Sequence, residues 1–235
     1  AVALTTRGHN RGDRLWVQFE PQPMSLHPCF SATALCLLYT LAMPAQPIDK
    51  TSDEFRARFL EQIPKNSLSS TQGDSMMLRV LIQNGNLKRG IEVGVAFGYG
   101  AIQMGMAFER NKGSLTSIEI DPQRAETARQ NVAAVGLDKT VSVVAGDALA
   151  VLPKLEGQYD FIYIDALKSD YLKYMKAIEP KLRRGAIVVA DNVIVSARAM
   201  ADFLDYMRTS PDYESITIRA SDEKHDGMLI AYKRK

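Results

Sequence analysis

Two short acidic segments follow apolar runs in the second half of the chain. Asp165 comes directly after residues 161–164, and the pair Asp191-Asn192 comes directly after residues 187–190. If these runs are neighbouring parallel strands, they lie about 5 Å apart and end at the same edge of a sheet. Two carboxylates and one amide oxygen suit Mg²⁺ or a similar hard cation. Either acid alone would be an ordinary strand-ending residue, but the set predicts a divalent-metal site.

A lysine lies three residues beyond the first of these acids. Lys168 would sit beside the metal site, where a partly desolvated lysine can have a lowered pKa and act as a general base. In isolation the same residue would be a surface lysine. Lys168 and Asp165 are therefore the candidate catalytic residues.

A glycine-rich turn follows an earlier apolar run at residues 91–93. Gly94, Gly98 and Gly100 have the spacing G-x-x-x-G-x-G, and a helical pattern comes next. Glycines let the backbone approach a ligand closely, and a helix N-terminus offers free N–H groups to an anion. The spacing differs from the G-x-G-x-x-G of dinucleotide-binding folds, which disfavours a nicotinamide dehydrogenase. An ordinary tight turn would give a similar pattern, so this segment alone decides little.

Further acids follow the next two predicted strands. Glu119 lies 25 residues after Gly94 and can accept both hydroxyls of a ribose, or it can simply end a strand while Asp121 caps a helix. We assign Asp121 to the cap and Glu119 to the ribose. Asp147, which precedes Ala148, can be a helix cap or a partner for an adenine amino group, and the adenine role is favoured.

Alternating strand and helix patterns from about residue 50 would position these groups. The last two strands are joined by fewer than ten residues, too short for a helical crossover, so they should pair antiparallel. We predict an α/β, Rossmann-like fold with a mostly parallel seven-stranded sheet, an antiparallel C-terminal hairpin and helices on both faces. The expected helices are 53–63, 74–84, 101–110, 121–136, 148–155, 171–182 and 197–208, and the expected strands are 91–93, 115–120, 141–145, 161–164, 186–190, 215–219 and 228–232.

Composition excludes several other classes of protein. The chain has 235 residues, 46% of them hydrophobic, which suffices for one α/β domain with a sizeable core. With 29 basic and 27 acidic residues the net charge is only +2, which argues against a dedicated nucleic-acid binder. Two cysteines and three scattered histidines make neither a disulfide framework nor a four-ligand zinc site. A metal bound here must be held by oxygen.

The N-terminal region contains an uncharged stretch at residues 21–48. Its mostly apolar part, residues 32–43, is shorter than the roughly 20 residues of a membrane-spanning helix, so we expect no stable membrane insertion. Residues 24–45 resemble the apolar core of a signal peptide, although the cleavage site is poor. We favour a packed helix or a dimer contact and a cytoplasmic protein, with export left open. The expected organisation is an N-terminal extension, 1–50, and a single domain, 51–235.

From about residue 70 to its end, the chain resembles the metal-dependent class I O-methyltransferases, which include catechol O-methyltransferase and caffeoyl-CoA O-methyltransferase. The metal segments are specific as a set. The segments that carry the resemblance are 92–99 (EVGVAFGY), 118–122 (IEIDP), 146–148 (GDA), 165–168 (DALK), 190–192 (ADN) and 225–227 (HDG).

The resemblance implies S-adenosylmethionine as the cofactor, together with a divalent metal, most simply Mg²⁺. It implies methyl transfer to a hydroxyl of a small, catechol-like aromatic acceptor by a homodimer that binds no nucleic acid. Lys168 would be the base, and the metal would be held by Asp165, Asp191 and Asn192. The residues expected at the cofactor are Glu92, Gly94, Val95, Gly98, Gly100, Glu119, Asp147, Ala148 and Asp165.

Three positions depart from the family pattern. Gly100 stands where the family usually has Ser or Thr to bind the methionine carboxylate, so backbone N–H groups would have to suffice. Asp74 stands where many members have Gln after Gly73. The pair Ala166-Leu167 resembles the bacterial and plant branch rather than the mammalian catechol enzyme, which leaves the substrate gate undefined.

Two other functions stay open. A class I methyltransferase that needs no metal would act on a protein, an RNA or a nitrogen nucleophile, and metal dependence separates it from the first reading. A non-catalytic module would bind the cofactor but methylate no acceptor.

Overall fold

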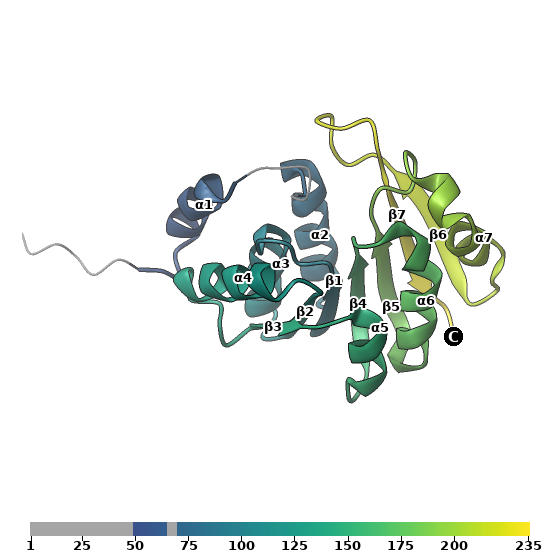
Figure 1. The fold of residues 1–235 in the computed structure, drawn as a ribbon, viewed down its shortest axis with the longest axis horizontal. Coiled ribbons are helices and arrows are strands. Elements are labelled where there is room, and N and C mark those ends of the chain that lie inside the picture. Colours follow the sequence, from purple (N-terminus) through teal and green to yellow (C-terminus); the bar gives the residue numbers. More distant parts are fainter. Residues whose placement is uncertain (1–48, 65–69) are drawn as a thin grey trace, which may run out of the picture. The chain divides into compact units, whose positions relative to one another are not determined.

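A single seven-stranded sheet organises the residues that the computed structural model describes, 49–64 and 70–235 (Figure 1). The strand order is β3-β2-β1-β4-β5-β7-β6; β1 to β5 are mutually parallel, and β7 is antiparallel to both of its neighbours. The predicted fold class is therefore confirmed. The strands are β1 (Arg89–Val93), β2 (Ser114–Glu119), β3 (Val141–Ala145), β4 (Tyr159–Ile164), β5 (Leu182–Ala190), β6 (Tyr213–Ile218) and β7 (Met228–Lys233).

Helices cover both faces of the sheet. Figure 1 shows α2, α3 and α4 over one face and α5, α6 and α7 over the other. Each helix side buries its own hydrophobic cluster against the sheet, as expected for an α/β fold. The helices are α1 (Asp53–Gln62), α2 (Gln72–Asn84), α3 (Tyr99–Arg110), α4 (Pro122–Ala134), α5 (Ala148–Val151), α6 (Tyr171–Ile178) and α7 (Ala201–Thr209).

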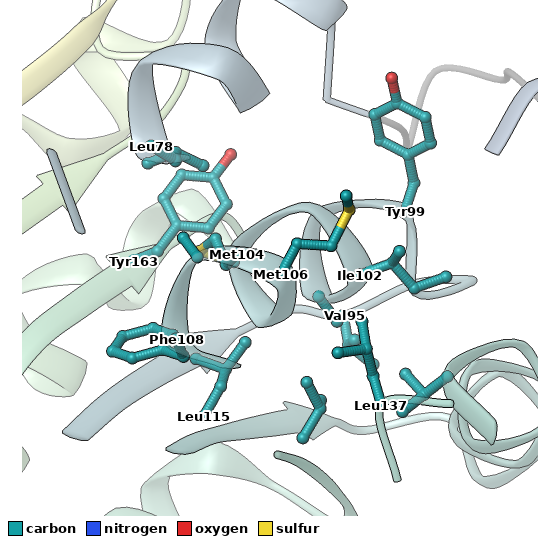
Figure 2. Close-up of a cluster of buried hydrophobic side chains, with 14 of the residues drawn as sticks. Leu78, Val95, Tyr99, Ile102, Met104, Met106, Phe108, Leu115, Leu137 and Tyr163 are labelled. Atoms are coloured by element: carbon teal, nitrogen blue, oxygen red, sulfur yellow. The ribbon is translucent and has the colours of Figure 1, made fainter. Parts of the chain in front are cut away.

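The central strand β4 is buried on both faces. Phe161 and Tyr163 belong to the core under α3, while Ile162 and Ile164 belong to the core under α6. This alternation follows from the two-residue period of a strand. Figure 2 shows the Tyr163 ring beside Met104, within the first of these clusters. Burial of an apolar side chain of this size stabilises the fold by about 1.5–3 kcal/mol, so β4 is held firmly from both sides.

The helix predicted for 171–182 is shorter than expected. The helix α6 ends at Ile178, a 3₁₀ turn follows at Glu179–Lys181, and Leu182 already pairs with Tyr159 as the first residue of β5. Pro180 contributes to the difference, because proline has no N–H to donate to a carbonyl of the preceding turn.

The C-terminal hairpin forms as predicted. In the hairpin, β6 and β7 pair antiparallel, with Ser215 opposite Ala231. In addition, β7 pairs antiparallel with β5, so that Leu229 lies opposite Ala190. This second pairing brings the connection at residues 219–227 to the carboxyl end of β5, where the candidate site lies.

The expectations for the N-terminal extension concern residues outside the described part of the chain, including the uncharged stretch at 21–48. Within residues 49–64 and 70–235, no helix is long and apolar enough to cross a membrane.

Candidate functional site

The carboxyl ends of three adjacent strands converge at one edge of the sheet. Val93 pairs with Ile164, and Ile164 pairs with Ala190, so the residue after each strand emerges at the same level. The Asp165 N–H donates to the Val93 carbonyl (2.9 Å), and the Asp191 N–H donates to the Ile164 carbonyl (3.0 Å). A cavity of about 600 Å³ lies here, where open α/β folds bind their ligands.

Gly94 is the point where the first strand touches the fourth. Its φ of +95° lies in the left-handed region, and a Cβ added there would come within 2.1 Å of the Asp165 carbonyl oxygen. Any side chain at this position would push the Asp165 carbonyl away and alter the wall of the cavity. Glycine is therefore required both for the turn and for the close approach of β1 to β4.

Glu92 is a buried carboxyl group directly beneath the turn. Burial raises its pKa to about 8, and the Ser117 hydroxyl, which donates to Oε2 at 2.6 Å, only partly opposes that rise. A Cβ at Gly100 would lie 2.8 Å from Glu92 Oε1. A serine at position 100 would therefore require a shift of the Glu92 carboxyl group. Glu92 and Gly100 line a narrow recess that adjoins the main cavity at Gly94 and Asp165.

Glu119 ends β2 and lines the main cavity. Its Oε2 accepts the N–H of Ala96 (2.9 Å), and its Oε1 accepts the N–H of Asp121 (3.1 Å). Arg124 adds an ion pair at 2.6 Å and also lines the cavity. A ribose bound here would either share Glu119 with the Arg124 guanidinium or displace that guanidinium from Glu119.

Asp121, which the sequence assigns to a helix cap, and Asp147, for which it favours an adenine role, both cap helices. The Asp121 carboxylate accepts the N–H groups of Gln123 and Arg124 at the start of α4. The Asp147 carboxylate accepts the N–H of Leu149 at the start of α5 (2.9 Å). Asp147 and the neighbouring Ala148 also line the main cavity, so capping leaves the adenine role of Asp147 available.

Two of the expected cofactor residues lie behind the cavity wall. The Val95 side chain is buried in the core under α3, as Figure 2 shows, and Val95 borders only the narrow recess. Gly98 forms the left-handed start of α3, with a φ of +91°. It borders neither space, and a Cβ there would press on Ala128 of α4. Both residues can shape the cofactor side only through the backbone of the turn.

The two predicted metal ligands with carboxylates do come together. The Tyr163 hydroxyl lies 3.4 Å from Oδ2 of Asp165 and 3.4 Å from Oδ2 of Asp191. Burial first, and then the negative charges of Asp165 and Asp191, raise the pKa of Tyr163 well above its ordinary value, so the phenol stays protonated. Burial, followed by the charge of Asp165, raises the pKa of Asp191 to about 6.

Asn192 is oriented by a buried aspartate. Asn192 Nδ2 donates to Asp226 Oδ2 (3.1 Å), so the amide oxygen is on the opposite side of the group. Asp226 also accepts the N–H groups of Ile194, Val195 and Gly227, and these donors outweigh burial and lower its pKa. The backbone of Asn192 is left-handed, with a φ of +60°, a conformation that asparagine tolerates better than most residues.

Lys168 reaches back over the edge of the sheet to the first acid. Its Nζ donates to Asp165 Oδ1 (2.8 Å) and to the hydroxyl of Tyr171 (3.0 Å). Tyr171 in turn donates to the carbonyl oxygen of Asp191 (3.1 Å). Lys168 is thus fixed at the cavity wall by Asp165 directly, and it is linked to the Asp191 carbonyl through Tyr171.

A second lysine, which the sequence did not single out, lies on the other acid. Lys224 Nζ donates to both carboxylate oxygens of Asp191 at 2.8 Å and makes a 2.8 Å ion pair with Asp74. Lys224 also lines the main cavity. Each predicted metal-binding carboxylate therefore has an ammonium partner in this structure.

The donor set fits a hard divalent cation in its chemistry. Asp165, Asp191 and Asn192 supply two carboxylates and one amide oxygen at one edge of the cavity. In the described residues, no group of three or more His, Cys, Asp or Glu side chains is arranged to hold a metal, and this set has only two. An ion bound here would need its remaining oxygens from an acceptor or from water.

Tyr163, Tyr171, Lys224 and Asp74 are polar groups of the site that sequence reasoning missed. Tyr163 carried a usable signal, because it lies two residues before Asp165 and so shares its face of β4. The sequence marks Asp74 only as a departure from the family pattern, and Tyr171 and Lys224 carried no signal, since their partners are distant in sequence or lie across a turn.

Comparisons with known proteins indicate one family for this chain. The sequence model of a family described as O-methyltransferase matches residues 50–210, more than half of the chain. A catechol O-methyltransferase of Niastella koreensis is 35% identical over 142 residues, which are 59% of this chain and 63% of that protein, less than two thirds of its length. A catechol O-methyltransferase of Mycobacterium tuberculosis is 32% identical over 187 residues, 74% of this chain and 83% of that protein.

A solved structure gives the same answer for the fold. The cofactor-bound Rv0187 protein from MTB superposes with a TM-score of 0.69 at 26% identity, covering 77% of this chain and 88% of that one. Together with the family match and the relatives, this similarity identifies the chain as a member of the O-methyltransferase family.

Proposed function

We propose that the chain uses S-adenosylmethionine to methylate a hydroxyl of a small, catechol-like acceptor held by a divalent metal. The observation that carries this proposal is the shared cavity of about 600 Å³, which both halves of the predicted site line. Gly94, Glu119 and Ala148 line the cofactor half, and Asp165, Lys168 and Asp191 line the acceptor half. A methyl donor and an acceptor bound in one enclosure can be aligned, which lowers the barrier by several kcal/mol in well-oriented pairs.

The cofactor half offers matching groups for each part of S-adenosylmethionine, which supplies a methyl group on a sulfonium. Glu119 faces the cavity as a ribose partner, and Asp147 and Ala148 border the place for an adenine. The helix α3 begins without a side-chain cap at Gly98, so its first N–H groups are available to a carboxylate. Glu92, in the adjoining recess, can receive an ammonium group once it is ionised.

Asp165, Asp191 and Asn192 would hold the metal. A divalent cation there would stabilise negative charge on the acceptor oxygens and lower the pKa of the hydroxyls. That help matters because a phenol with a pKa near 10 is only about 0.1% ionised at neutral pH.

Lys168 is the group placed to remove the acceptor proton. Asp165 and Tyr171 fix its Nζ at the cavity wall. Because Lys168 Nζ is paired with the Asp165 carboxylate here, the base role requires the metal to engage that carboxylate in its place. A general base in this position typically contributes about 10²–10⁴-fold to the rate.

The rim of the acceptor half suits an aromatic ring. Leu167 lines the cavity next to Lys168 and is 62% exposed, so it offers an apolar surface to a bound ring. The Niastella and Mycobacterium relatives are both named catechol O-methyltransferase, which supports the same class of acceptor.

The direct test is methyl transfer from S-adenosylmethionine to caffeate and 3,4-dihydroxybenzoate, each with Mg²⁺ and with EDTA. We expect product with Mg²⁺ and none with EDTA. Transfer that survives EDTA would contradict the metal role. Bound cofactor without transfer to either compound would argue for a different acceptor or a non-catalytic module.

A metal-independent O-methyltransferase is the second candidate, and one observation favours it. The Lys224 ammonium already neutralises Asp191, so the acid cluster has a cation without a metal. In that case transfer would be insensitive to EDTA and would depend on Lys224.

A further inference from the structure

Lys224 occupies the position at which a metal would have to meet Asp191. Both carboxylate oxygens of Asp191 accept hydrogen bonds from Nζ at 2.8 Å. A hard cation needs at least one of these oxygens as a direct ligand. The ammonium and the metal therefore compete for Asp191, because two cations held by one carboxylate repel each other.

The contact is built into the fold rather than lying on the surface. The Asp191 side chain is 2% exposed, the Asp74 side chain 1%, and the Lys224 side chain only 23%. Buried carboxylates need a positive partner, because an unpaired buried charge destabilises a protein by several kcal/mol. The pairing of β7 with β5 carries Lys224 to this place from a connection that follows β6.

Asp74 is a second ion-pair partner for the Lys224 ammonium. It lies in the first turn of α2, and its Oδ2 is 2.8 Å from Lys224 Nζ. A lysine side chain has four flexible carbons, so Nζ can give up Asp191 and keep Asp74 with a small rotation. The Asp74 departure noted in the sequence is explained by this partner.

We propose that Lys224 is a tethered cation that competes with the divalent metal for Asp191 and moves to Asp74 alone when the metal binds. This inference rests on the metal site of the proposed function. It assigns to Lys224 and Asp74 the tuning of metal affinity: the metal binds tightly only to the fraction of molecules in which Lys224 has released Asp191.

The test is the affinity of the full chain, without cofactor, for Mn²⁺. Isothermal titration calorimetry and the EPR signal of free Mn²⁺ both measure this affinity. The informative protein is the double variant Lys224→Met, Asp74→Asn. It removes one positive and one negative charge, so the net charge around the metal is unchanged, while Asp191 loses its ammonium partner and is left for the metal. We expect it to bind Mn²⁺ about tenfold more tightly than the wild type, which corresponds to a competent fraction of about 10% in the wild type.

Two further variants sharpen the result. Asp74→Asn alone should weaken Mn²⁺ binding, because Lys224 then has only Asp191. Lys173→Met, which removes an exposed lysine paired with Asp170, should leave the affinity unchanged.

If the double variant bound Mn²⁺ with wild-type affinity, the proposed competition would be wrong, because removal of the Lys224 ammonium would not have made Asp191 more available to the metal. Asp191→Asn separates this failure from that of the proposed function. If Asp191→Asn abolishes Mn²⁺ binding while the double variant matches the wild type, only the role of Lys224 falls. If Asp191→Asn binds Mn²⁺ as the wild type does, the metal site at Asp191 falls, and the competition falls with it.

Discussion

The two halves of the cavity are held in place by different means. On the cofactor side, Glu119 is fixed by two backbone N–H groups as well as by Arg124, and Glu92 is held by Ser117. On the acceptor side, a lysine side chain holds each of Asp165 and Asp191, and Asp191 accepts one backbone N–H, that of Asn192. Backbone donors are fixed as soon as the sheet forms, whereas lysine side chains can exchange one partner for another. Folding therefore fixes the cofactor half in advance, whereas a ligand can rearrange the ion pairs of the acceptor half.

The largest effect should come from the lysine of the acceptor half. We expect Lys168→Ala to lower kcat by about 10²–10⁴-fold, because the acceptor proton loses its base. The affinity for S-adenosylmethionine should change by less than about twofold, since Lys168 contacts only groups of the acceptor side. Steady-state kinetics and calorimetry measure the two quantities separately. Unchanged turnover would remove Lys168 from the reaction, and a loss confined to cofactor affinity would place it in the wrong half.

Gly94, which lies between the two halves of the cavity, is the site of the second prediction. Gly94→Ala should lower kcat/KM by about 10²-fold, because the added Cβ would displace the Asp165 carbonyl by about an ångström. Backbone strain should also reduce the free energy of unfolding by about 1–3 kcal/mol. Kinetics and urea unfolding measure these changes.

Gly136→Ala is the matched control for Gly94→Ala. Gly136 is also left-handed, with a φ of +66°, but a Cβ there has no atom closer than 3.6 Å. It should lose stability without losing activity. If Gly94→Ala retained full activity, the close contact between β1 and β4 would have no role in catalysis.

The smallest effect concerns the buried Glu92 of the cofactor half and the pH dependence of the free energy of unfolding. The folded protein raises the pKa of Glu92 from 4.5 to about 8, so its contribution to stability is present below pH 4.5 and is lost as the pH rises through 8. Glu92→Gln removes this loss, and its amide oxygen can still accept the Ser117 hydroxyl. We expect the variant to match the wild type near pH 5 and to exceed it by a few kcal/mol near pH 9, at about 1.4 kcal/mol per pKa unit. Urea unfolding at both pH values measures this. Parallel pH profiles would show that Glu92 is ionised throughout.

The sequence predicted the positions of the strand ends better than the partners found there. The site edge was predictable because an apolar run that ends in an acid marks the carboxyl end of a buried strand, as at Asp165 and Asp191. Asp121 and Asp147 were predictable as caps because a cap is a local interaction. Lys224 was not, because its contact with Asp191 depends on β7 lying beside β5, a pairing set by the whole sheet.

Tyr163 illustrates a different limit. Its side chain belongs to the core under α3, and in the sequence it reads as one apolar residue among several in β4. Only the three-dimensional structure shows that its hydroxyl reaches both carboxylates of the acceptor half. A side chain with an apolar body and a polar tip carries both roles, and hydrophobic periodicity registers only the first.

The central claim is that one cavity holds an independent cofactor half and a metal-dependent acceptor half. The variant Asp191→Asn tests this most directly when methyl transfer with Mg²⁺ and affinity for S-adenosylmethionine are measured on the same preparation. Asp205→Asn, an exposed aspartate of α7, serves as the control. We predict that Asp191→Asn lowers Mg²⁺-dependent transfer by more than about 100-fold and leaves cofactor affinity within about twofold, because even outer partners of a metal cost 10–100-fold. Full transfer by this variant, or equal transfer in EDTA, would contradict the account.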